Sequence, residues 1–496
     1  MLLAGLDIGT TGCKITIYHP DGEYLGRLYR DYPHMRTAEE HEVDAGLIWQ
    51  AVKELLREAA ERYPGIGAIG VTSFGEAFVL LDEDDKPLCN TMLYTDPRGS
   101  EECETLCAKV GRDTLTYITG VNPHSMYAIV KLMWVMNNRS EIYKAARHVC
   151  QMGEFVVYLL TGTAQVDYSL ATRTLAFDVR ALEWSNEIFS AVSVDKTLFS
   201  KAVPTGTSAG VLKPKMASEL GLSPGVIVIS AGQDQLAAAV GSGVFDAGMA
   251  VDGAGTVECI TPVYEGIPEG AYMRDANYTI IPYVERNKYI CYAYLYTGGA
   301  LVQWFVENLA GYAAAAAAQA DVPVYTLLEG TELHDHPTGI LVLPHFAGAA
   351  TPYMDYGSKG AIVGLTVSST QQDIYLAVME GVCYEMRLNM ERLSDAGVHF
   401  NMLQATGGGA KSRVWMQMKA DILNVTVTAL RSDEAGGAGA AMMAGLAAGL
   451  YSNLREAAVK MVSAREVFLP RKEVHDRFDV IYKKYLKLYS AVRPLV

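Results

Sequence analysis

Long hydrophobic runs and an excess of positive charge are both missing from this sequence of 496 residues. No apolar stretch approaches the length needed to span a bilayer, so no contact with a membrane is expected. The first residues, MLLAGLDIGTTG, lack a basic segment and a cleavage site, which predicts no signal peptide and a cytoplasmic protein. The formal net charge of −15 argues against nucleic acid as a partner, because binding a polyanion needs a basic surface.

Clustered cysteines are scarce as well. Of the eight cysteines, only Cys103 and Cys107 are close in sequence. A single C-x3-C without a second pair of ligands gives little support for zinc, so buried thiols in a reducing compartment are expected. The phosphate loop G-x4-G-K-[ST] is also absent. A small molecule is the better partner, and an anionic cofactor would need backbone amides or a metal, since long-range attraction would be unfavourable.

The N-terminus is predicted to form two strands joined by a tight turn. Leu2 to Ile8 has the pattern of a buried strand, and polar and apolar residues alternate from Lys14 to Tyr18. Gly9, Thr10 and Thr11 lie in the turn between them. Glycines and hydroxyls in such a turn let backbone N–H groups approach a phosphate. Asp7 comes just before the turn and could hold Mg²⁺ through water, although a hydrogen-bonded turn carboxylate is the plainer alternative.

The same arrangement returns near the middle of the chain. Gly248 to Asp252 again predicts a strand ending in Asp, followed by the turn residues Gly255 and Thr256 and then a second strand. Asp7 and Asp252 are separated by about half the chain. We infer an internal duplication with a boundary near Phe245, which predicts a mixed α/β protein with domains at residues 1–245 and 246–496.

One more carboxylate stands out just before that boundary. The stretch from Val226 to Gly243 predicts a strand, a break at Ala231-Gly232 and a helix, with Asp234 at the strand end beside the helix N-terminus. Backbone N–H groups and the helix dipole favour the charged form of a carboxylate placed there. That suits a general base, but Asp is also a preferred helix cap, and the local pattern alone favours the cap.

Taken together, the motifs resemble the FGGY family of carbohydrate kinases across essentially the whole chain. The opening Asp7-Ile8-Gly9-Thr10-Thr11 with Lys14 is similar to the family's first phosphate motif. The stretches 360–365 and 373–380 resemble its second signature, and GGGAKSRVWMQMKAD from Gly407 resembles its adenosine region. The resemblance implies two actin-like (ribonuclease H-like) domains with a cleft between them, the first binding the sugar and the second ATP.

The resemblance also implies roles for individual residues. Asp234 would be the general base that removes a proton from the sugar hydroxyl as it attacks the γ-phosphate of Mg-ATP, and Gln235 would contact the same hydroxyl region. Tyr94-Thr95-Asp96-Pro97-Arg98 resembles the family's Trp-x-Asp-x-Arg, so Asp96 and Arg98 would line the sugar pocket. Asp7 would hold Mg²⁺. The residues implied for ATP are Gly9, Thr10, Thr11, Lys14, Gly255, Thr256, Gly298, Gly408, Gly409 and Ala410.

The resemblance to the family does not identify the substrate of this chain. Glycerol kinases of the family carry Gln-Arg-Glu-Thr where this chain has Phe74-Gly75-Glu76-Ala77, and xylulokinases carry Gln-Met-His-Gly. Glu76 and Asp96 could each accept hydrogen bonds from neighbouring sugar hydroxyls, with a surface salt bridge as the alternative. We expect a pentulose such as xylulose or ribulose as acceptor. The alternatives are a polyol kinase of the glycerol or erythritol type and a non-catalytic regulator that binds sugar and ATP, and a homodimer is left open.

Overall fold

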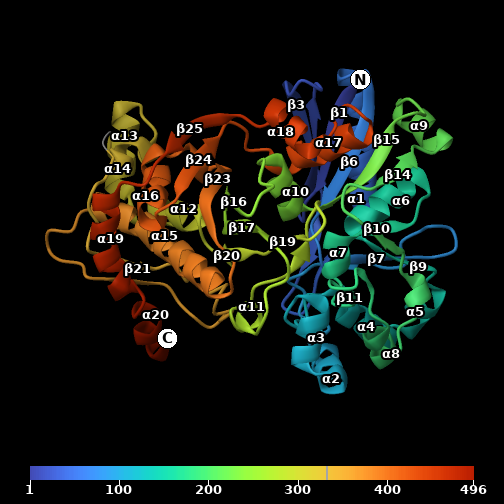
Figure 1. The fold of residues 1–496 in the computed structure, drawn as a ribbon, viewed down its shortest axis with the longest axis horizontal. Helices are drawn as coiled ribbons and strands as arrows, with labels where there is room; N and C mark the ends of the chain where they lie inside the picture. Colours follow the sequence, from blue (N-terminus) through green and yellow to red (C-terminus); the bar gives the residue numbers. More distant parts are fainter. Residues whose placement is uncertain (331–332) are drawn as a thin grey trace. The chain divides into compact units, whose positions relative to one another are not determined.

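A computed structural model describes residues 1–330 and 333–496 of the chain (Figure 1). It divides into two compact units, each built from separate segments of sequence. Unit 1 contains Met1–Phe245, Thr279–Ile290 and Glu434–Val462, and unit 2 contains Asp246–Tyr278, Cys291–Asp433 and Ser463–Val496. The first segment of unit 1 ends at Phe245, and two later segments join the same unit.

The centre of unit 1 is a sheet in the order β14-β15-β6-β1-β2-β3. β1 pairs antiparallel with β2 and parallel with β6, and β6 pairs parallel with β15. β1 and β6 are almost entirely buried, as expected for parallel strands whose two faces are covered by helices. The strands are β1 (Leu2–Ile8), β2 (Gly12–Tyr18), β3 (Tyr24–Asp31), β6 (Ile66–Ser73), β14 (Ser208–Val211) and β15 (Ile227–Gln233).

Unit 2 repeats this arrangement strand by strand. β16 pairs antiparallel with β17 and parallel with β23, β17 pairs with β20, and β24 continues the sheet from β23 to the antiparallel β25. The repetition is that of two actin-like units, and it supports the duplication inferred from sequence. The strands are β16 (Gly248–Ala254), β17 (Glu258–Glu265), β20 (Ala293–Leu295), β23 (Phe400–Thr406), β24 (Thr426–Leu430) and β25 (Ala464–Phe468).

A glycine-rich helix, α17 (Ala435–Ala447), packs on the sheet of unit 1 and on α10 (Asp234–Gly241) (Figure 1). A Cβ at Gly437 would lie 2.2 Å from Thr16 Oγ1, and one at Gly439 would lie 1.9 Å from the Ala237 carbonyl oxygen. Because real side chains cannot approach so closely, the glycines set the distance between this helix and its neighbours. Close helix packing therefore accounts for the sequence EAGGAGA.

The other elements surround the two sheets. Those of unit 1 include β4 (His34–Arg36), β5 (His41–Val43), β7 (Phe78–Leu81), β8 (Thr91–Met92), β9 (His148–Gln151), β10 (Gln165–Asp167), α1 (Ala45–Arg62), α2 (Ser100–Val110), α3 (Arg112–Thr119), α4 (Ala128–Asn138), α5 (Ser140–Ala145), α6 (Met152–Thr161), α7 (Tyr168–Thr172), α8 (Asn186–Val192), α9 (Pro214–Leu220) and α18 (Leu454–Met461). Those of unit 2 include β21 (Leu341–Leu343), β22 (Ala361–Val363), α12 (Gly299–Leu309), α13 (Gly311–Ala320), α14 (Val324–Glu329), α15 (Gln371–Asp395), α16 (Arg413–Leu423), α19 (Lys472–Tyr485) and α20 (Leu488–Val492). Across the described ranges, every helix falls short of the length or the apolar character that crossing a bilayer requires.

Candidate active site

The first predicted phosphate turn lies at the end of the β1–β2 hairpin. Asp7 is opposite Lys14 in the register of the two strands, and Lys14 Nζ lies 3.3 Å from Asp7 Oδ2 and 3.1 Å from Glu434 Oε2. Burial raises the pKa of Asp7, and the Lys14 ammonium acts in the opposite direction. The turn itself is open to ligands, because Thr11 is exposed and Thr10 half-buried, while Gly9 N donates to the Gly12 carbonyl.

Asp234 is the first residue of α10, directly after β15. The helix cap is the preceding Gln233, whose side chain accepts from the Gln235 amide. The local pattern predicted Asp234 as the cap, and that prediction was wrong by one residue. Asp234 Oδ1 accepts from Gln233 Nε2 at 2.5 Å and from the Gln235 amide at 2.6 Å. This places both Asp234 and Gln235 in the first turn of the helix.

The protonation of Asp234 also differs from the expectation that its surroundings favour the charged form. Burial raises its pKa to about 7, and the negative charges of Asp7 and Glu76 add to the shift. The Gln235 amide and Arg173 act in the opposite direction without cancelling it. Desolvation and the two neighbouring carboxylates therefore raise the pKa of Asp234 by more than the helix N-terminus lowers it. A carboxylate that titrates near neutrality is suited to general base chemistry.

Glu76 lies in the loop between β6 and β7 with φ of 66°. For a residue with a side chain this left-handed conformation is uncommon and is often found at functional sites. Its Oε1 accepts from Arg173 Nε at 2.5 Å and pairs with Arg173 Nη2 as well. The guanidinium of Arg173 in turn lies 5.1 Å from the ring centroid of Tyr127. Glu76 is buried, so the surface salt bridge considered from sequence does not describe it.

Gly75 makes room for this ion pair. A Cβ at Gly75 would lie 2.8 Å from Arg173 Cγ. The aliphatic stem of Arg173 thus passes over the backbone at the position where the glycerol kinase motif carries an arginine. A guanidinium is supplied to this loop from a distant part of the sequence.

Asp96 and Arg98 are bound to each other and to their surroundings. Asp96 Oδ1 accepts from Arg98 Nε at 2.9 Å, and Asp96 Oδ2 accepts from the His41 amide at 2.7 Å. Arg98 also pairs with Glu42 at 2.5 Å and lies over the ring of Trp134. Both oxygens of Asp96 thus accept hydrogen bonds within the protein. This network fixes the loop that carries Tyr94, whose pKa is raised by burial and then by the charges of Glu76 and Asp234.

Three residues near these carboxylates were not singled out from sequence. Arg173 lies within the polar segment DYSLATRT, but nothing local marks it as the partner of Glu76. Tyr94 was seen only as part of the Tyr94–Arg98 motif. Lys131, inside the apolar helix α4, donates to the Leu93 carbonyl oxygen, and burial lowers its pKa to about 8. A lysine among apolar residues was the available signal for it.

The second predicted phosphate turn lies in unit 2, at the end of β16. Gly255 and Thr256 are exposed, and their carbonyl oxygens accept from the amides of Gly299 and Gly298 at 2.9 and 3.1 Å. The glycine run after β23 reaches the same strand end, because a Cβ at Gly409 would lie 3.1 Å from Ala254 Cβ. Gly408 is exposed, whereas Ala410 is buried and its carbonyl oxygen accepts from Arg465. The structure therefore brings together all six residues predicted for ATP in this half.

Asp252, the counterpart of Asp7, has a different environment. Lys419 Nζ donates to Asp252 Oδ2 at 2.5 Å and also to Glu258 Oε1, and all three side chains are fully buried. The carboxylate is neutralised inside the protein and is out of reach of a ligand. Of the two duplicated aspartates, only Asp7 keeps access to its surroundings.

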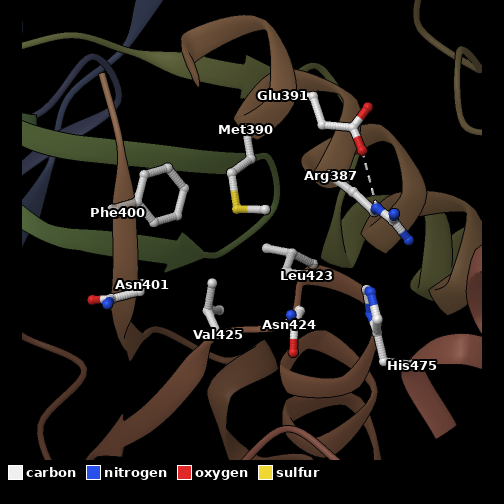
Figure 2. Close-up of a pocket in the computed structure, with 9 residues that line it drawn as sticks. All are labelled: Arg387, Met390, Glu391, Phe400, Asn401, Leu423, Asn424, Val425 and His475. Carbon is white, nitrogen blue, oxygen red and sulfur yellow. Dashed lines mark hydrogen bonds and ion pairs between the residues drawn. The ribbon is translucent and has the colours of Figure 1, made fainter. Parts of the chain in front are cut away.

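A separate cavity of about 250 Å³ lies within unit 2 (Figure 2). Its apolar wall is formed by Met390, Phe400, Leu423 and Val425, and Arg387 bonds to Glu391 on the other side, as Figure 2 shows. None of the residues predicted for sugar, ATP or metal lines it. It plays no part in the site built around Asp234.

Comparisons with known proteins identify the family of the chain. The family model "FGGY family of carbohydrate kinases, N-terminal domain" matches residues 2–241, and the corresponding C-terminal domain matches residues 269–448. The chain is 24% identical to a xylulose kinase of Bacillus subtilis, covering 99% of this chain and 97% of that protein. It is 29% identical to a glycerol kinase of Halorhodospira halophila, covering 98% and 95%. The crystal structure of a xylulose kinase from Rhodospirillum rubrum shares the fold, with a TM-score of 0.88, 23% identity and coverage of 100% and 99%.

These matches span both units and include relatives that act on sugars and on polyols. Sugar kinases of the family use ATP, typically with Mg²⁺. The protein is accordingly a phosphotransferase with an alcohol group as acceptor, and the chain belongs to the FGGY family of carbohydrate kinases.

Proposed function

We propose that this protein is an ATP-dependent kinase that phosphorylates a hydroxyl of a pentulose such as xylulose or ribulose, with Asp234 as general base. The observation that carries the proposal is the carboxylate of Asp234, whose pKa is raised to about 7 beside Asp7, Glu76 and Arg173. At neutral pH about half of such groups are ionised and can accept a proton, and the protonated form releases it readily. Full-length similarity to xylulose kinases supports the choice of acceptor.

The residues of the chain fit the nucleotide that the family uses. Thr11, Gly255 and Gly408 are exposed, and the space next to Gly408 where a Cβ would point is open. Asp7 offers the carboxylate oxygen that Mg²⁺ prefers and would hold the ion. When bound, Mg-ATP supplies the phosphoryl group together with a cation that neutralises its charge.

Phosphate binding and proton transfer would then be carried out by a few groups of the protein. Lys14 and the Gly9–Thr11 turn would bind phosphate oxygens in unit 1, and Gly255 and Thr256 would do so in unit 2. Asp234 would take the proton of the acceptor hydroxyl. The hydroxyl oxygen would bond to the γ-phosphorus as the bond from that phosphorus to the leaving ADP breaks. A base in this position typically contributes about 10²–10⁴ in rate.

The substrate pocket in this proposal is centred on Glu76. Its carboxylate is held by Arg173 and would accept hydrogen bonds from neighbouring hydroxyls of the sugar. Gln235 would contact the reacting hydroxyl. Asp96 and Arg98 would act mainly by fixing the loop of Tyr94, since their polar atoms already bind each other.

A polyol acceptor of the glycerol or erythritol type is the second candidate. Glu76 is the residue that favours it, because it matches the glutamate of the glycerol kinase motif, while an arginine side chain reaches it from position 173. A non-catalytic regulator is disfavoured, since Asp234, Thr10 and Gly255 are all retained.

The test is ADP release from Mg-ATP with a panel of ketoses, aldoses, sugar acids and polyols. A pentulose is expected to give the largest kcat/KM, and preference for glycerol or erythritol would favour the second candidate. If no acceptor raises turnover above the rate with water, the protein does not act as a kinase of these compounds.

A further inference from the structure

A second group of reactive side chains lies in unit 1, where β9 (His148–Gln151) passes into α6 (Met152–Thr161). It consists of His148, Cys150 and Glu154, and it shares no residue with the site around Asp234. Within residues 1–330 and 333–496, it is the one group of three or more histidine, cysteine or acidic side chains arranged closely enough to hold a metal ion. We propose that these three side chains bind one Zn²⁺ ion.

Local structure explains why the three side chains meet. His148 and Cys150 are two residues apart on a strand, so their side chains point to the same face. β9 pairs antiparallel with β7, which holds this face in place through the pairs Leu81 with His148 and Val79 with Cys150. Glu154 lies in the first turn of α6 and turns back toward the strand, where its Oε2 accepts from the Gln151 amide at 3.0 Å.

The three side chains lie close enough together to meet at one small divalent cation. Cys150 Sγ lies 3.4 Å from His148 Nδ1, and Glu154 Oε1 lies 3.3 Å from His148 Nε2. One ligand atom from each residue lies within 4.8 Å of the others. Tetrahedral Zn²⁺ with ordinary bond lengths needs ligand atoms roughly 3.3–3.6 Å apart. One ion binds a single ring nitrogen, so Nδ1, next to Cys150, would be the ligand, and the Glu154 carboxylate would have to shift toward it from its present place beside Nε2.

An unsatisfied buried atom points to the same conclusion. Glu154 is 3% exposed, and its Oε1 makes no hydrogen bond within the part of the chain that the structure describes, although it lies 3.3 Å from His148 Nε2. Because Oε2 is already used by the helix, Oε1 remains as the ligand oxygen. Ser200 Oγ lies 2.5 Å from His148 Nε2 and would orient the ring, as the outer hydrogen bonds of metal-binding histidines do. Cysteine spacing could not reveal this set, since it contains one cysteine only.

The donor set selects the metal. One nitrogen, one thiolate sulfur and one carboxylate oxygen suit zinc, whereas Mg²⁺ and Ca²⁺ prefer oxygen ligands alone. Binding would release the thiol proton of Cys150 to solvent. The fourth position would be taken by water. Since the three ligands come from β9 and α6, the ion would fix the start of that helix to the strand, independently of phosphoryl transfer.

The test uses full-length protein without a histidine tag, stripped with EDTA and titrated with Zn²⁺ or Co²⁺. We expect one ion per chain by elemental analysis, and with Co²⁺ a thiolate-to-metal charge-transfer band. Cys150→Ser should abolish the band, and His148→Ala should weaken Zn²⁺ affinity at least tenfold. Cys103→Ser is the matched control, because it removes another buried thiol of the same unit and should leave binding unchanged.

His148 keeps some exposure, so His148→Ala is expected to fold even if Cys150→Ser does not, and circular dichroism checks both. The inference is overturned if the wild-type protein shows no band with excess Co²⁺. It is also overturned if Cys150→Ser or His148→Ala binds as tightly as Cys103→Ser. In either case the three groups form only a hydrogen-bonded chain. Metal content is the readout, so failure here leaves the proposed kinase activity untouched.

Discussion

The side chains of Asp7 and Lys14 face each other across the β1–β2 pair, with Lys14 Nζ 3.3 Å from Asp7 Oδ2. In the duplicated hairpin of unit 2, the matching Asp252 is instead paired with Lys419 from α16 and is fully buried. One topology thus carries two kinds of carboxylate–lysine pair. The first is partly exposed, whereas the second is fully buried and serves the fold.

Replacing Lys14 by Met should impair the use of ATP. The ammonium would lose its charge-assisted hydrogen bonds to phosphate, which are worth about 1.5–3 kcal/mol, so kcat/KM for Mg-ATP should fall about 10- to 100-fold. Steady-state kinetics with varied Mg-ATP measures the effect. Lys86→Met is the control, because Lys86 is exposed and pairs only within its own turn. Equal kinetics for the two variants would exclude Lys14 from the nucleotide site.

Activity should depend on pH through Asp234. The base must be ionised to accept a proton, and its pKa is raised to about 7, so kcat/KM for the acceptor should be lost as the pH falls through about 7. Glu76→Gln removes one of the charges that raise this pKa, and the acidic limb should move to lower pH even though activity falls. A limb near pH 4 in the wild-type protein would contradict the raised pKa.

Gly75→Ala should act on the acceptor sugar and leave ATP largely unaffected. The added Cβ would lie 2.8 Å from Arg173 Cγ, so the stem of Arg173 must move and carry Glu76 with it. We expect KM for the sugar to rise about tenfold, the equivalent of about 1.4 kcal/mol, with KM for Mg-ATP within twofold. Gly225→Ala is the control, since its backbone is not left-handed and its Cβ would meet only Ser223 Oγ at 3.8 Å. A rise in both KM values would point to general disruption.

Lys419→Met should destabilise the protein strongly. It leaves Asp252 and Glu258 buried without their cation, and breaking a buried ion pair in this way costs about 3–5 kcal/mol. Urea denaturation measures the loss, with the exposed Lys472→Met as control. Adding Asp252→Asn and Glu258→Gln should restore part of the stability. A Lys419→Met protein as stable as the control would show that the triad is not a structural centre.

Sequence patterns predicted the features that depend on neighbouring residues. The two hairpins with Asp7 and Asp252 and the strand–helix unit of Asp234 were predicted because alternation, glycine turns and helical spacing are local. The partners of those carboxylates were not. Arg173 reaches Glu76 across 97 positions and Lys419 reaches Asp252 across 167, and such pairings are created only by the fold.

The charge state of Asp234 shows the same limit in another form. Its place at a helix N-terminus could be predicted and favours ionisation, but the opposing effect of burial and of Asp7 and Glu76 depends on tertiary structure. The helix cap at Gln233 was missed because glutamine is not among the preferred capping residues.

The most direct test of the account compares Asp234→Asn with the wild-type protein in two measurements on the same samples. Calorimetry with Mg-ATP should give dissociation constants within about threefold, and transfer to the best acceptor, followed by ³¹P NMR of the sugar phosphate, should fall by at least about 10²-fold. Transfer that persists at near wild-type rate would show that Asp234 is not the base.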